Sequence, residues 1–159
     1  MRAKARLRRA SHAASPTPTM ASNSAWVALM LGWVVALVSF LGAMFFSEVM
    51  DLEPCVLCWY QRIAMFPLVV ILGIGAFLQD RHCIRYGLPL AAAGWLLAGY
   101  HWLLYKGFIP KGLQPCGKGA SCAEVKLELA GFITIPLLSF AAFSLILLLL
   151  VAAHRKFKP

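Results

Sequence analysis

Long apolar runs separated by short polar segments set the pattern of this chain. Four runs are predominantly apolar, and they cover residues 26–46, 59–78, 87–105 and 132–153. A helix needs about 20 residues, at a rise of about 1.5 Å per residue, to cross about 30 Å of hydrocarbon. Because lipid offers no hydrogen-bond partners to backbone N–H and C=O groups, each run is expected to be helical. The pattern predicts an all-α membrane protein, a four-helix transmembrane bundle.

The composition agrees with a membrane protein and narrows its contacts. Of the 159 residues, 61% are hydrophobic and 13% are charged, whereas soluble domains are about half apolar and about a quarter charged. The net charge of +9 would also suit a nucleic-acid binder. The basic residues gather at the two ends of the chain, however, and form no groove with interleaved aromatic residues. We therefore expect contact with anionic lipid and no nucleic acid.

Lysine and arginine predict the orientation of the four runs. The N-terminal tail, the loop 81–85 and the C-terminal tail are short and basic, which favours the cytoplasmic side. The loop 47–57 carries three acidic residues and no lysine or arginine, so it is expected to face outward. An even number of spans then places the loop 106–131 outward as well, although it carries four lysines. Both termini are therefore predicted to be cytoplasmic.

The same pattern divides the chain into three segments. Residues 1–25 are rich in Arg, Ala, Ser and Pro and have no apolar period, so we expect a basic, disordered cytoplasmic tail. Residues 26–153 form the predicted four-span domain, and residues 154–159 form a second basic cytoplasmic tail. Glycines within the runs, at positions 73, 75, 94 and 99, are expected to let the helices pack closely.

The cysteines are the candidate chemistry of this chain. Cys55 and Cys58 lie where a polar loop becomes the second apolar run, and a thiolate at the start of a helix is stabilised and reactive. A second pair, Cys116 and Cys122, occurs in the other outward loop. Disulfides persist outside the cytoplasm, so the two pairs together indicate dithiol exchange. Cys83, alone on the inner side, is expected to be an inert free thiol.

Other uses of paired cysteines are less consistent with the sequence. A structural disulfide does not need the Cys-x-x-Cys spacing, which gives a labile bridge. A four-cysteine zinc site is disfavoured because five residues lie between Cys116 and Cys122, more than the usual two to four. A c-type haem needs a histidine where Trp59 stands. A soft-metal transporter needs ligands along the spans, and they offer only His101. We expect no metal site, with the transporter and a structural subunit as alternatives.

Redox exchange requires an electron acceptor. Two polar residues, Arg62 and His101, are candidates to bind such an acceptor near Cys55 and Cys58, which we call the anchored pair because they are held at the start of the second run. Electrons reaching Cys55 and Cys58 have to leave, and a quinone can approach from within the bilayer. Arg62 is a charge within a span, which indicates function. It follows Cys58 by one helical turn, so it can stabilise that thiolate or hold a quinone carbonyl. His101 is either a member of an interfacial aromatic belt or a hydrogen-bond partner of the quinone.

These motifs resemble a known family. The stretch CVLCWYQR, followed by an apolar span, is similar to the DsbB family of disulfide-forming membrane proteins. The four spans, the second pair of cysteines and the stretch GFITIPLLSF at the start of the last run resemble that family too. The resemblance covers residues 26–153. It implies a bacterial inner-membrane protein that reoxidises a DsbA-like thioredoxin-fold thiol oxidase. It also implies that the electrons pass to a quinone, either ubiquinone or menaquinone.

The resemblance also implies roles for individual residues. By position, the thiolate of the partner would attack Cys116, and the released Cys122 would attack Cys55. Cys58 would then be left as the thiolate that faces the quinone, with Arg62 supporting its charge.

The spacing of the second pair of cysteines differs from that in the best-known members of the family and resembles one particular branch. Only residues 117–121 separate the second pair of cysteines, a short form that resembles the branch called BdbC. Vitamin-K-epoxide-reductase-like proteins, which are also four-helix quinone enzymes, are a further alternative. Their cysteine motif lies on the last helix, whereas here it opens the second run.

Overall fold

The computed structural model describes residues 20–109, 128–129 and 133–157. Within these ranges there are four helices, α2 (Met20–Glu48), α3 (Val56–Phe77), α4 (Cys83–Tyr105) and α5 (Ile135–Phe157). Two short strands, β1 (Glu128–Leu129) and β2 (Ile133–Thr134), precede α5 in the chain. They form an antiparallel pair with Leu129 opposite Ile133. The prediction of an all-helical protein is confirmed apart from this short hairpin.

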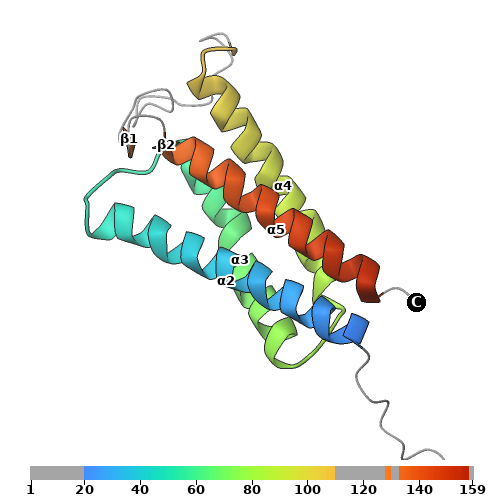
Figure 1. Cartoon of the computed structure of the whole chain (residues 1–159). Coiled ribbons are helices and arrows are strands. Elements are labelled where there is room, and N and C mark those ends of the chain that lie inside the picture. The colour runs from blue at the N-terminus through green and yellow to red at the C-terminus, as the bar shows by residue number, and fades with distance from the viewer. Residues whose placement is uncertain (1–19, 110–127, 130–132, 158–159) are drawn as a thin grey trace, which may run out of the picture.

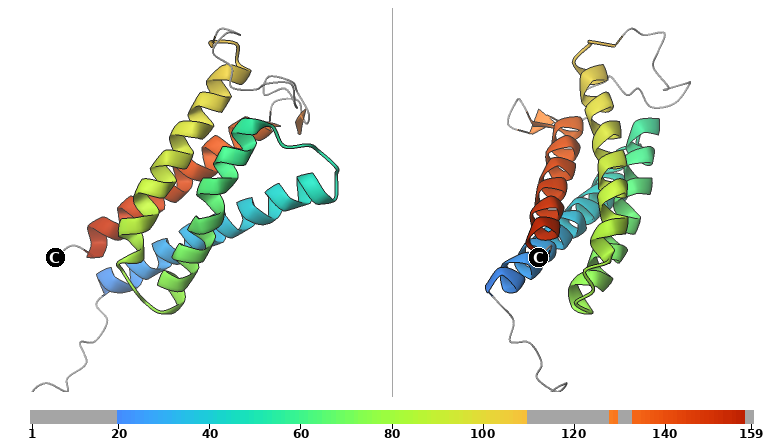
Figure 2. Two further views of the ribbon diagram at one scale, coloured as in Figure 1. Left: turned by 180° about the vertical axis from the view of Figure 1, so that it is seen from behind. Right: turned by 90° about the vertical axis from the view of Figure 1, so that its right-hand side faces the viewer.

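The four helices pack against one another as a ring. α2 contacts α3 and α5, and α4 contacts the same two helices from the other side, as Figures 1 and 2 show. Fully buried apolar side chains fill the space between them, and the largest are Leu29, Leu68, Leu72, Ile84, Leu104, Phe143, Ile146 and Leu150. The apolar runs thus form a common core.

Three of the described helices are long and apolar enough to cross a membrane. They are the Asn23–Glu48 part of α2, all of α3 and all of α5. α4 has the same length as α5, 23 residues, but its Pro89, His101, tyrosines and tryptophans lower its mean hydropathy. The chain is therefore a multi-pass membrane protein, in which the predicted third span is the least apolar helix.

All four helices extend beyond the predicted runs, and α3 and α4 begin early, at Val56 and Cys83. α2 begins at Met20, ahead of the predicted start at residue 26, and α5 continues through His154 to Phe157. The rings of Trp26 and Phe157 pack edge to face with their centroids 4.7 Å apart. This contact joins the N-terminal part of α2 to the last turn of α5.

Three of the four predicted glycines allow close approach of the helices. A Cβ atom on Gly75 of α3 would overlap the side chain of Cys83 on α4. A Cβ atom on Gly94 of α4 would overlap the ring of Phe143 on α5. A Cβ atom on Gly73 of α3 would lie 2.8 Å from Nε1 of Trp33 on α2. The expectation that these glycines permit tight packing is confirmed. At Gly99 an added Cβ would make an ordinary contact of 3.4 Å with Phe140, so this position is not tight.

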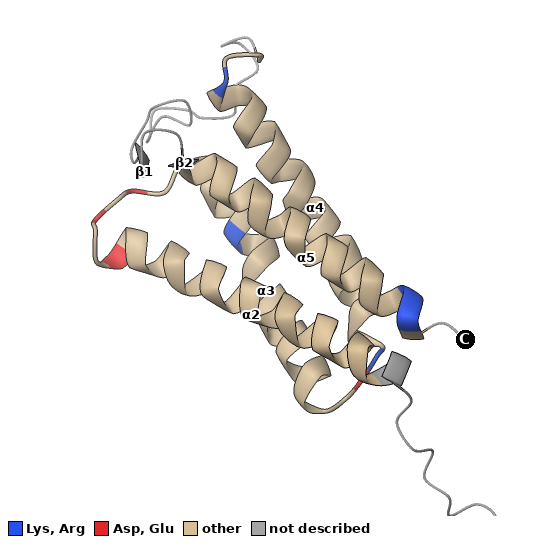
Figure 3. Cartoon of the chain, in the orientation of Figure 1, with Lys and Arg blue, Asp and Glu red and all other residues tan. Residues whose placement is uncertain are grey.

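Acidic and basic side chains lie toward different ends of the bundle. The connection between α2 and α3 carries three acidic residues, and it lies at the end where α5 begins (Figures 1 and 3). Arg81 and Arg85 follow α3 at the opposite end, where α5 also finishes with Arg155 and Lys156. Among the described residues there are three exceptions: Arg62 lies within α3, Lys106 follows α4 at the end where α5 begins, and Asp80 precedes Arg81 at the opposite end.

Candidate functional site

The first turn of α3 holds the anchored pair of cysteines. Cys55 is the N-cap residue, with φ −70° and ψ 167°, and its side chain accepts a hydrogen bond from the backbone N–H of Cys58 at 3.3 Å. The first N–H groups of a helix have no partner within the helix. The Cys55 sulfur takes the place that a serine or aspartate oxygen has in most N-caps, where the helix favours negative charge.

The two sulfur atoms lie next to each other. Their Sγ–Sγ distance is 2.7 Å, so a disulfide needs only a small movement of the side chains. Cys55 is buried, with 5% of its surface exposed, whereas Cys58 is partly exposed. The prediction that this spacing brings the two thiols together agrees with the geometry.

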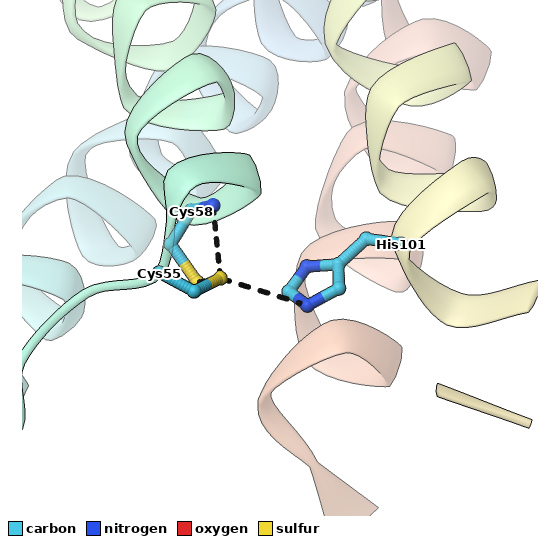
Figure 4. A group of neighbouring side chains, drawn as sticks. All are labelled: Cys55, Cys58 and His101. Carbon is cyan, nitrogen blue, oxygen red and sulfur yellow. Dashed lines mark hydrogen bonds between the residues drawn. The ribbon is translucent and has the colours of Figure 1, made fainter. Parts of the chain in front are cut away.

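His101 of α4 faces this pair (Figure 4). Its Nε2 atom lies 3.8 Å from Sγ of Cys55. On the other side of the ring, Nδ1 lies 3.1 Å from Nε2 of Gln61. Only 3% of the surface of His101 is exposed. His101 therefore points into the bundle, which corrects the alternative that it belongs to an interfacial aromatic belt.

Arg62 reaches across to the end of α2. Its Nη2 atom donates hydrogen bonds to the carbonyl oxygen of Ala43 at 2.8 Å and to Oγ of Ser47 at 2.9 Å. Its guanidinium carbon lies 5.3 Å from the ring centroid of Trp59, within the range of a cation–π contact. The sequence placed Arg62 one helical turn after Cys58, and its charge acts on that sulfur. Its described hydrogen bonds go to the negative, C-terminal end of α2.

A largely apolar cavity of about 460 Å³ adjoins these residues. Its polar lining includes Cys55, Cys58, Gln61, Arg62 and His101, and further polar side chains come from Ser39, Glu53, Tyr105, Thr134 and Ser139. Helices α2 and α5 supply apolar and small side chains on the other sides, including Gly42 and Phe143. The volume is in the range of sites for small organic molecules. A flat apolar ring with polar oxygen atoms, such as a quinone, suits this combination of walls and donors.

The electrostatics of the pair favour a thiolate on Cys55. A hydrogen bond from the Cys58 side chain lowers the pKa of the Cys55 thiol well below its usual value, and a hydrogen bond with His101 adds to the effect. Burial acts in the opposite direction and is outweighed. The family resemblance assigned the final thiolate to Cys58, whereas in the reduced pair seen here the hydrogen bonds converge on Cys55.

The remaining predicted cysteines lie elsewhere. Cys116 and Cys122 fall outside the described residues, so the prediction of a second redox pair stays a prediction. Cys83 is buried at the start of α4 and is packed against Gly75 of α3. His101 is near the other end of α4, so Cys83 lies far from the anchored pair. This position agrees with an inert thiol.

The cluster also offers three metal ligands. The ligand atoms of Cys55, Cys58 and His101 all lie within 4.8 Å of one another, and two cysteines with one histidine are a donor set found at catalytic zinc sites. The sulfur atoms, however, are 2.7 Å apart, closer than the roughly 3.8 Å that two thiolates need on one tetrahedral zinc. The distance between the two sulfur atoms therefore favours disulfide formation over joint ligation of a metal ion.

Two residues of the site were missed by sequence reasoning. Gln61 bridges to His101, and Ser47 holds Arg62. Gln61 does carry a signal, because it is an uncharged polar residue within the apolar turns that follow Cys58. Ser47 stands at the polar end of an apolar run, and nothing in the sequence separates it from an ordinary boundary residue.

Comparison with known proteins agrees with this arrangement. The family model described as "Disulfide bond formation protein DsbB" matches residues 23–153. The chain is 46% identical over 139 residues to a "Probable disulfide formation protein" of Metapseudomonas resinovorans, covering 87% of this chain and 96% of that one. It is also 46% identical over 124 residues to "Disulfide bond formation protein C" of Bacillus subtilis (strain 168), covering 77% and 88%. A "Probable disulfide formation protein" of Chlamydia muridarum (strain MoPn / Nigg) is 47% identical over 128 residues, covering 80% and 92%. No solved structure matches significantly.

Proposed function

The chain belongs to the DsbB family of disulfide bond formation proteins, and on this premise we propose a specific electron route for it. It is a disulfide-forming membrane oxidoreductase. In our proposal it reoxidises a DsbA-like thiol oxidase outside the cytoplasm and passes the electrons to a membrane quinone. The observation that carries the proposal is the cysteine pair, with its sulfur atoms 2.7 Å apart, on the polar wall of a largely apolar cavity.

The proposed topology has four spans in the bacterial inner membrane with both termini in the cytoplasm. Three helices have the length and composition of spans, and α4 lies in the same ring between α3 and α5. The basic residues that follow α3 and end α5 support a cytoplasmic position for that end of the bundle. The cysteine pair at the start of α3 then lies on the extracytoplasmic side.

Electrons enter this route through the loop between α4 and α5. The thiolate of the partner attacks Cys116, which breaks a Cys116–Cys122 disulfide and releases Cys122 as a thiolate. Cys122 then attacks Cys55, which breaks the Cys55–Cys58 disulfide and releases Cys58. The second thiolate of the partner then releases Cys116, which attacks Cys122, re-forms the Cys116–Cys122 disulfide and frees Cys55. Each exchange forms one S–S bond and breaks one, so two electrons move from the partner to the anchored pair. This part of the proposal follows from family membership.

The cavity residues serve the second half of the route. A bound quinone, ubiquinone or menaquinone, supplies the acceptor for two electrons and two protons. Arg62 has five N–H donors, and the hydrogen bonds described for it use only Nη2, so other donors can hold a carbonyl oxygen. The apolar side chains of α2 and α5 exclude water, which strengthens this charged hydrogen bond.

The proposal is tested by replacing one sulfur. Cys58→Ser is expected to abolish quinone reduction by purified protein supplied with a reduced DsbA-type oxidase. Cys83→Ser, which also removes one thiol, is the matched control and should retain turnover. Normal turnover in Cys58→Ser would exclude the anchored pair from the route.

A soft-metal transporter remains the second candidate because three metal ligands cluster at the same place. Metal analysis of the purified protein, with and without reductant, separates the two functions. A transporter retains stoichiometric zinc or copper and turns over no quinone. The proposed oxidoreductase reduces quinone in the presence of a chelator.

A further inference from the structure

A buried hydrogen bond joins α3 to α4 directly behind the cysteine pair. It links Nε2 of Gln61 to Nδ1 of His101 at 3.1 Å, and the two residues are 6% and 3% exposed. Every buried side-chain nitrogen and oxygen atom in the described part of the chain has a partner. An unpaired amide or imidazole in such surroundings would be costly, so the contact fixes both side chains.

The identity of the two atoms determines the direction of this hydrogen bond. An amide nitrogen only donates, so Nδ1 of His101 has to accept. A neutral imidazole carries a single proton, and that proton is then on Nε2. Nε2 is the atom that lies 3.8 Å from Sγ of Cys55. The chain of contacts therefore runs from Gln61 through His101 to one particular sulfur.

We propose that Gln61 is a positioning residue that holds His101 in the tautomer whose Nε2–H donates to the sulfur of Cys55. The two thiols of the reduced pair therefore have different protonation states. Cys55 receives hydrogen bonds from His101, from the Cys58 side chain and from the backbone N–H of Cys58. Cys55 is held as the thiolate, and Cys58 keeps its proton on the side of the partly exposed cavity wall.

This division deepens the proposed quinone reductase function and rests on it. To reform the disulfide, Cys58 first loses its proton, and the Cys55 thiolate then bonds to the Cys58 sulfur as that sulfur passes an electron pair to the quinone. The pair gives up two electrons, which the quinone takes together with two protons. One proton comes from Cys58, and the other comes from solvent, which earlier took up the proton that Cys55 released when it ionised. His101 keeps its own proton throughout and holds the attacking sulfur in place.

Nitrogen-15 NMR of the reduced, quinone-free protein tests the tautomer directly. The full chain is labelled at histidine, and a His101→Gln sample identifies the His101 signals among the four histidines. We expect His101 to be protonated on Nε2 and unprotonated on Nδ1. A proton on Nδ1, alone or on a doubly protonated ring, would overturn the proposal. The measurement needs no substitution at Gln61 and no quinone turnover. The proposed tautomer can therefore be refuted while the quinone reductase function is confirmed, and the function can be refuted while the tautomer is confirmed.

A pair of substitutions tests the part played by Gln61. Gln61→Met keeps the length of the side chain but cannot donate, so iodoacetamide should modify Cys55 on the order of tenfold more slowly at neutral pH. Gln79→Met, at an exposed position after α3, is the control and should leave the rate unchanged. Gln61→Glu offers only acceptors, so its His101 should carry a proton on Nδ1. An unaltered Cys55 rate in Gln61→Met, or an unprotonated Nδ1 in Gln61→Glu, would contradict the positioning role.

Discussion

Replacing Arg62 with methionine should weaken quinone use far more than use of the protein partner. Methionine keeps most of the side-chain length and removes the charge. It also removes the hydrogen bonds from Nη2 to Ala43 and Ser47 and the contact with Trp59. The two hydrogen bonds end on α2 at the wall of the cavity, so the substitution changes the wall that would contact the quinone.

The structure limits how much of the effect can come from unfolding. The Ala43 carbonyl keeps a hydrogen bond from Oγ of Ser47 at 2.9 Å after Arg62 is gone. No buried acceptor is therefore orphaned, and the loss of stability should be about 1–2 kcal/mol. A charged hydrogen bond to a quinone carbonyl is worth about 1.5–3 kcal/mol, which corresponds to a rise of about 10- to 150-fold in KM for quinone.

The assay is a pair of titrations with purified full-length protein in detergent. A short-chain quinone is varied at saturating reduced partner, and the partner is then varied at saturating quinone. Arg85→Met is the matched control, because Arg85 is exposed near the start of α4, at the other end of the bundle. If KM for the partner rises while KM for quinone stays constant, Arg62 serves the partner and our assignment is refuted.

Three further predictions concern packing, the lone cysteine and the reactive thiol. Gly94→Ala should lower the thermal unfolding temperature, with a cost of about 1–3 kcal/mol because its Cβ overlaps the ring of Phe143. Gly42→Ala, where a Cβ meets nothing within 4 Å, should not, and equal melting of the two variants would disprove the tight contact. Cys83→Ala should leave turnover intact in a coupled assay, and lost activity would reveal a role for this buried thiol. The lowered pKa of Cys55 predicts that its alkylation rate is near maximal at neutral pH and falls only as the pH drops through the lowered pKa. A rate that still climbs between pH 7 and about pH 9 would show an ordinary thiol.

The sequence predicted the helices well because their apolar runs are long and uninterrupted. It predicted their ends less well. The last turn of α5 is basic, for example, and its composition predicted a cytoplasmic tail instead of a helix. Basic residues at a helix C-terminus interact favourably with the helix dipole, and Phe157 packs on Trp26. These two effects let α5 continue through His154.

The candidate site was predictable only where its residues are neighbours in sequence. The spacing of Cys55 and Cys58 within one helical turn predicted their contact. The contact between Gln61 and His101 joins residues 40 positions apart, and it depends on how α3 and α4 are rotated against each other. Both helices are apolar on most sides, so the pattern of residues does not fix that rotation. The reach of Arg62 to Ser47 depends in the same way on the packing of α3 against α2.

The most direct test of the proposed electron route is a single turnover of the protein without its partner. Fully reduced, full-length protein is mixed anaerobically with a known amount of quinone and then alkylated, and the modified peptides are identified by mass spectrometry. We predict that one quinol forms for each disulfide and that Cys55 and Cys58 are the thiols lost. Quinone that stays oxidised while both thiols remain open to alkylation would contradict the proposed route.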